Sequence, residues 1–139
     1  MRCVRTVPQP ARPMPTQWRD SPPLSTTDYA LGIYDANGLV LDAIVPAGSG
    51  WEAGLSGFKY KSRSGTPDGV TQILLRTGAD GKAKILVQGK GAALGMPRLA
   101  TVAQALRVQL LSSDGPCWEA VYSVPPTKSA AEIFTDRAD

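Results

Sequence analysis

The stretch GKAKILVQGKG, from Gly81 to Gly91, contains two Gly-Lys pairs, and these residue types bind phosphate in nucleotide-binding loops. Such a loop needs Ser or Thr after the lysine to hold magnesium, and it opens a helix whose N-terminus faces the anion. Here Ala83 follows Lys82 and Gly91 follows Lys90, and the apolar residues between them alternate as in a strand. The pattern therefore favours a turn and a strand over a nucleotide site.

Acidic residues also occur in patterns that could hold calcium or hydrolyse glycosidic bonds. Asp35, Asn37 and Gly38 are spaced like the start of a calcium loop, but no acid stands where a bidentate ligand would close it. A hairpin turn satisfied by its own side chains is favoured instead. A glycosidase needs a pair of carboxylates, and their spacing in this sequence selects no two of the acids available. These acids are Asp42, Glu52, Asp68 and Glu119.

The chain contains no histidine, the commonest general base and transition-metal ligand. Its two cysteines, Cys3 and Cys117, cannot supply the four ligands of a cysteine-rich zinc site. An enzyme would need a lysine or carboxylate base in a pocket that shifts its pKa. The sequence therefore predicts a protein that is not an enzyme, with no catalytic residues, no cofactor and no metal.

Lysines next to aromatic residues form the candidate binding site. Aromatic faces beside cations can hold sugar rings or anionic polymers by stacking and charge. The candidate ligand face consists of Trp51, Lys59, Tyr60, Lys61, Lys82, Lys84 and Lys90. Burial between two sheets is the alternative for these aromatics and for Trp118 and Tyr122. A binding face requires the lysines on one face with an exposed aromatic ring between them.

Short strands separated by turns must position these side chains. Apolar runs at 28–34 and 39–45 flank an Asn-Gly pair, the strongest short hairpin signal. Further strands are predicted around 58–63, within 81–91, at 105–112 and at 117–124; residues 70–78 fit a strand, although one helical turn would also match. The expected fold class is all-β, an antiparallel β-sandwich of about six to seven short strands. Alternate residues of a strand face the same side, so the apolar positions of these strands predict the core. The predicted core residues are Leu31, Ile33, Ile85, Val87, Val108 and Leu110.

The two ends of the chain differ in composition from its centre. Residues 1–24 are rich in proline and arginine and are expected to form an extended, disordered arm that folding does not require. Residues 25–126 are the predicted sandwich domain. Residues 127–139 form a tail, in which Ser129 and Glu132 match a capping box for one or two helical turns. Because Cys3 lies on the arm, Cys117 is expected to be a largely buried free thiol.

The net charge of +3 comes from the arm, which contains four arginines and one aspartate. The rest of the chain carries eleven basic and eleven acidic residues. A nucleic-acid partner is not expected, because such proteins carry their excess charge on the folded domain. No apolar run approaches the ~20 residues that span a bilayer, so membrane insertion is not expected either. The N-terminus lacks the apolar region of a signal peptide. We expect a monomer.

The segments YALGIYD, GFKYKSRSGTPDGV, GADGKAKILVQGKGAAL and VQLLSSDGPCWEAVYS follow one another from Tyr29 onward, and a tail with Phe134 and Asp136 closes the pattern. In order and spacing they resemble an uncharacterised domain of secreted or cell-surface bacterial proteins. The resemblance implies an exported location and a β architecture, but no reaction. Relatives of this type often carry cysteine where this chain has Gly32 and Gly50, so the disulfide of an oxidising compartment is not implied here.

Two functions are consistent with these features. The first is a non-catalytic structural or interaction β-sandwich module of an exported bacterial protein. The alternative is a carbohydrate or anionic-polymer binding module that uses the lysine and aromatic face, with a polysaccharide or another cell-envelope polymer as its partner.

Overall fold

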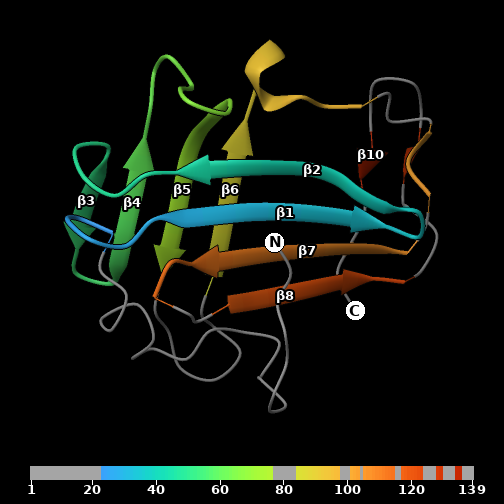
Figure 1. Ribbon diagram of the computed structural model, residues 1–139. Coiled ribbons are helices and arrows are strands. Elements are labelled where there is room, and N and C mark those ends of the chain that lie inside the picture. Colours follow the sequence, from blue (N-terminus) through green and yellow to red (C-terminus); the bar gives the residue numbers. More distant parts are fainter. Residues whose placement is uncertain are drawn as a thin grey trace.

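The computed structural model describes residues 23–76, 84–97, 101–103, 105–114 and 117–123, together with the backbone of Lys128–Ser129 and Phe134–Thr135. Within these residues, eight strands form two open four-stranded antiparallel sheets that are stacked as a β-sandwich (Figure 1). The predicted all-β class is confirmed, with more strands than expected. No helix in this part of the chain is long and apolar enough to cross a membrane.

The first sheet has the strand order β2-β1-β7-β8, built from two hairpins that join where β1 pairs with β7. Its strands are β1 (Tyr29–Asp35), β2 (Gly38–Val45), β7 (Leu106–Ser112) and β8 (Cys117–Tyr122). The predicted turn between β1 and β2 forms because Asp35 Oδ1 accepts hydrogen bonds from the amides of Asn37 and Gly38, at 2.8 and 3.0 Å. The hairpin interpretation of this motif is therefore confirmed.

The second sheet follows chain order, β3-β4-β5-β6, and its strands cross behind those of the first sheet (Figure 1). Its strands are β3 (Trp51–Gly54), β4 (Gly57–Lys61), β5 (Val70–Arg76) and β6 (Lys84–Gly89). The predicted strand within Gly81–Gly91 is therefore β6, and a single 3-10 turn, η1 (Ala92–Leu94), follows it. The sequence did not predict β3, which is only four residues long and ends at a glycine.

The core lies between the two sheets. It is formed by the alternate side chains of each strand that point toward the opposite sheet. Tyr29 of β1 joins the sheets: its ring centroid is 5.4 Å from that of Trp51 and 6.3 Å from that of Trp118. Of the six predicted core residues, Leu31 and Leu110 are buried. The other four are partly buried and pack against the core: Ile33, Ile85, Val87 and Val108.

The described residues differ from the predictions at both ends of the domain. Pro23, expected in the arm, is buried, and its carbonyl accepts a hydrogen bond from Gly48 at 2.9 Å. The remainder of the predicted arm, residues 1–22, lies outside the described residues. Ser129, expected to cap a helix, belongs to strand β9 (Lys128–Ser129), which pairs with β10 (Phe134–Thr135).

The free thiol predicted at Cys117 is wrong, because Cys117 is disulfide-bonded. Cys3, the other cysteine of the sequence, lies outside the described residues. The prediction failed because it rested on the flexibility expected of a proline-rich segment, and proline content does not determine whether a cysteine forms a disulfide.

Candidate functional site

The outer face of the β3–β6 sheet carries most of the lysines of the predicted ligand face. Residues directly opposite each other on neighbouring strands project to the same face, so the registers define three outward rows. These rows are Glu52, Lys59, Leu74 and Leu86; Lys61, Gln72 and Gln88; and Arg76 and Lys84. The face is therefore basic, with one acid opposite Lys59 and two leucines near its centre.

The predicted lysines fall at three places on or beside this face. Lys59 and Lys61 lie side by side on β4, and Lys84 begins β6 opposite Arg76. Lys90 is exposed directly after β6, where its amide donates to the Gly69 carbonyl at 2.8 Å. Lys82 lies outside the described residues.

The predicted aromatic part of the site is not on this face. Trp51 and Tyr60 are opposite each other in the register and point inward, with 4% and 5% of their surface exposed and ring centroids 5.3 Å apart. Their polar atoms bond to backbone, since Trp51 Nε1 donates to Pro46 O at 3.1 Å and Tyr60 OH to Thr66 O at 3.4 Å. The reason is the period of two along β4, which turns Tyr60 away from the lysines on either side of it.

Trp118 is buried in the same aromatic cluster, and Tyr122 is partly buried. Trp51, Tyr60 and Trp118 are therefore buried between the sheets, which was the alternative to a binding role. Among the described residues, no aromatic ring from the predicted set lies exposed between the lysines, so stacking on a sugar ring is not available there.

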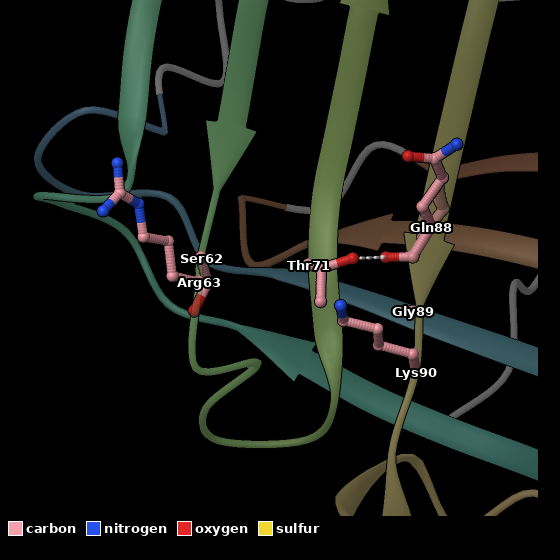
Figure 2. Close-up of a pocket in the computed structure, with 7 residues that line it drawn as sticks. Ser62, Arg63, Thr71, Gln88, Gly89 and Lys90 are labelled. Carbon is pink, nitrogen blue, oxygen red and sulfur yellow. Dashed lines mark hydrogen bonds between the residues drawn. The ribbon is translucent and has the colours of Figure 1, made fainter.

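A shallow, open hollow of about 690 Å³ borders this sheet where β5 begins and β6 ends. Its lining includes Ser62, Arg63, Thr71, Gln88 and Lys90 (Figure 2). Figure 2 shows the Lys90 amine beside Thr71, whereas the Arg63 side chain extends away from it. Thr71 Oγ1 donates to the Gln88 carbonyl at 3.3 Å.

The sequence did not indicate this hollow, because its lining comes from separate segments, at residues 62–63, 71 and 87–90. The pairing of β5 with β6 shifts in register nearby, between Val70 and Gln72. The structure thereby adds Arg63 and Thr71, on neighbouring segments, to the polar groups beside the lysine face.

A second hollow, of about 570 Å³, lies next to the first and shares Ser62 with it. Lys61, Gly50 and Pro67 are among its lining residues. Gly50 is required here, because a Cβ at this position would lie 2.3 Å from Cε2 of Tyr60. At Gly32 a Cβ would likewise lie 2.9 Å from a ring carbon of Tyr34, so tyrosine rings occupy the space beside both glycines.

The candidate carboxylates lie on both sheets and on the turn before β5. Asp42 and Glu119 share one outer face but are three strand spacings apart, about 14 Å, which exceeds the separation used in glycoside hydrolysis. Asp68 accepts a hydrogen bond from the Ile44 amide at 2.8 Å, and Glu52 lies on the other sheet. Within the described residues, no three acidic or cysteine side chains gather as a metal site would require.

Among the described residues, shifted pKa values occur at two places, and both belong to the framework of the sandwich. Burial, and secondarily the negative charge of Asp114, raises the pKa of Tyr29, which stays neutral in the core. Backbone amides, that of Ala103 above all, lower the pKa of Asp35 at the β1–β2 turn. Neither group lines the two hollows described above.

Comparison with known proteins finds no relative: no protein-family model matches the chain, and no curated protein or solved structure matches it.

Proposed function

We propose that this protein is a non-catalytic interaction module of an exported bacterial protein, and that it binds an acidic polysaccharide on the outer face of the β3–β6 sheet. The observation that carries the proposal is the charge of that face. Lys59, Lys61, Arg76 and Lys84 project from three neighbouring strands, and Glu52 is the one acid in the same rows.

The shape of the site supports a polymer over a small ligand. Strands lie about 4.8 Å apart, so the basic side chains are distributed over a broad surface that an extended chain can follow. Gln72 and Gln88, opposite each other, add amide groups that can hydrogen-bond to hydroxyl and carboxylate oxygens. Because Trp51 and Tyr60 point inward, recognition rests on charge and hydrogen bonds rather than on ring stacking.

Further observations support a non-catalytic role and an exported location. The chain contains no histidine, which favours binding over catalysis. The disulfide at Cys117 suits an oxidising compartment, as does the resemblance to secreted and cell-surface domains.

The test compares retention of the protein on dextran sulfate with retention on uncharged dextran. We expect binding to dextran sulfate only, and we expect it to weaken between 0.1 and 1 M salt, over which the Debye length falls from ~10 to ~3 Å. Lys61→Glu should lower the affinity roughly tenfold, because it reverses a charge on the proposed face.

The control is Arg107→Glu, which makes the same charge change on the outer face of the other sheet and should alter the affinity much less. Because Arg107 forms an ion pair with Glu119 at 3.6 Å, the folding of this variant is checked first by far-UV circular dichroism. Equal losses in both variants would show that net charge, and not this face, drives binding. Equal affinity for single-stranded DNA of matched charge would contradict a polysaccharide ligand. Absence of retention would favour a purely structural module.

A further inference from the structure

Polar side chains surround the first hollow, the one of about 690 Å³ at the start of β5 and the end of β6 (Figure 2). Gln88 lines it and also belongs to the outward row with Lys61 and Gln72, so the hollow adjoins the basic face of the β3–β6 sheet. Seven described residues line the hollow, of which Arg63 and Lys90 are cationic and none is acidic. The charge of the hollow therefore favours an anion.

Hydrogen bonds tie the three segments around the hollow to one another. Ser62 donates its amide to the Thr71 carbonyl at 2.9 Å, which joins the loop after β4 to β5. Thr71 Oγ1 in turn donates to the Gln88 carbonyl at 3.3 Å, which joins β5 to β6. The Lys90 amide donates to the Gly69 carbonyl at 2.8 Å, which joins the end of β6 to the start of β5. A ligand therefore meets a site that is already assembled, which reduces the cost of binding.

The backbone that carries Lys90 is packed closely. A Cβ at Gly89 would lie 2.9 Å from Cδ1 of Leu94 and 3.0 Å from the Gly69 carbonyl oxygen. A Cβ at Gly69 would lie 2.5 Å from the Leu94 amide nitrogen. Because neither glycine has room for a side chain, β6 and the start of β5 approach η1 closely. Lys90 therefore projects from a rigid base.

The side chains at the hollow offer complementary hydrogen-bonding groups. The Lys90 amine, which lies beside Thr71 in Figure 2, carries three protons and a full charge. Ser62 Oγ accepts the Gly65 amide at 3.1 Å, and its proton can go to Ser64 Oγ, 3.4 Å away, or to a ligand. Thr71 Oγ1 donates to a backbone carbonyl, so its lone pair can accept from a sugar hydroxyl.

The charges around the hollow indicate the shape of the anion. Residues 62–69 contain one acid, Asp68, and its carboxylate accepts the Ile44 amide on the first sheet at 2.8 Å. The Arg63 side chain extends away from Lys90 in Figure 2. An arginine fork matches a planar carboxylate, whereas a lysine acts as a point charge. A lysine beside hydroxyl groups therefore suits the oxygens of a tetrahedral anion.

We propose, on the basis of the proposed function above, that this hollow is the subsite for one tetrahedral ester anion, a sulfate or phosphate group carried on a sugar unit of the acidic polysaccharide. The Lys90 amine binds the anion, and the Ser62 hydroxyl donates to one of its oxygens. Thr71 Oγ1 accepts from a hydroxyl of the same sugar. The lysines of the adjoining face then hold neighbouring anionic groups of the polymer.

Titration of the isotope-labelled full-length protein tests the proposal, read by the backbone amide signals of Ser62, Thr71 and Lys90. The ligands are a glucose sulfate monoester, the corresponding phosphate ester, glucuronate and glucose. We expect the three signals to move together and to saturate with the esters, and the ester that binds more tightly identifies the preferred group. Glucuronate should bind roughly tenfold more weakly, and glucose should cause no shift.

Lys90→Gln removes the positive charge beside Thr71 and should abolish the shifts caused by the esters. It should also weaken retention on dextran sulfate roughly tenfold, because a charged hydrogen bond is lost. The backbone bond to Gly69 does not involve the side chain, so the fold should be unchanged. Arg107→Gln, which removes a charge from the outer face of the other sheet, should leave the titration unchanged. Far-UV circular dichroism checks the folding of both variants.

Shifts that persist in Lys90→Gln, or that centre on Lys59 and Lys84 in the wild type, would overturn the subsite. The proposed function would then still stand if the wild type is retained on dextran sulfate. Equal affinity for glucuronate and the esters would overturn the preference for a tetrahedral anion. Absence of wild-type retention on dextran sulfate would contradict the proposed function itself, and with it the polymer as the source of the anion.

Discussion

The Asp35 side chain accepts hydrogen bonds from three backbone amides beside the first sheet. Its Oδ1 closes the β1–β2 turn, and its Oδ2 accepts a hydrogen bond from the Ala103 amide at 3.0 Å, which ties the segment before β7 to the same carboxylate. The amides of Ala103, Asn37 and Gly38 lower the pKa of Asp35, against a smaller opposing effect of burial. The carboxylate is therefore more stable ionised in the folded protein than in the unfolded chain.

This shift predicts how stability depends on pH. A depressed folded-state pKa stabilises the fold above the unfolded pKa of about 3.9, and the contribution is lost as pH falls through the folded-state pKa. Asp35→Asn should therefore be less stable than the wild type at pH 7, by on the order of 1 kcal/mol given solvent screening, and the difference should shrink below pH ~3.9. Urea unfolding at several pH values measures it, with Asp42→Asn, an exposed acid on β2, as control. A difference that stays constant with pH would contradict this role.

At the scale of elements, β3 and β4 depend on the close approach of Gly50 to Tyr60. Lys61 donates its amide to the Gly50 carbonyl at 2.9 Å, so the backbone before β3 lies against the end of β4. The Tyr60 ring then fills the space that a side chain at residue 50 would need. The pair β3 and β4 therefore places Trp51 and Tyr60 in contact beneath the basic face.

Gly50→Ala should displace the Tyr60 ring from Trp51 and destabilise the fold by about 1–3 kcal/mol, as overpacking does. Gly54→Ala in β3 is the control, because the nearest atom to its new Cβ, the Gly57 carbonyl oxygen, is 3.7 Å away. Thermal melting and near-UV circular dichroism report the two effects. If both variants melt at the same temperature, the contact between Gly50 and Tyr60 is not a constraint on the fold.

At the scale of the whole molecule, burial depends on where a strand lies in its sheet. Ile73 on the interior strand β5 is fully buried, whereas Ile85 on the edge strand β6 is partly buried although both point inward. The sequence pattern favoured Ile85 as a core residue, since its strand alternates clearly. Alternation identifies a face but not the distance of a strand from the sheet edge.

Ile73→Ala should therefore cost about 2–5 kcal/mol in the free energy of unfolding, and Ile85→Ala clearly less, because the edge site leaves a smaller cavity. Chemical denaturation of the two variants, each compared with the wild type, gives the order. The opposite order would mean that β6, and not β5, is at the centre of the sandwich.

Local pattern was enough to predict the all-β class, the hairpin at Asn37 and Gly38, and the opposite faces of Lys59 and Tyr60, because each depends on residues only a few positions apart. The tertiary structure decided the rest. Which face of β4 became the core depended on the sheet packed against it, so only the structure showed that Tyr60, and not the lysines, turns inward. The pairing of β1 with β7, the register shift in β5 and the disulfide at Cys117 join residues far apart in the sequence, and no local periodicity encodes such contacts.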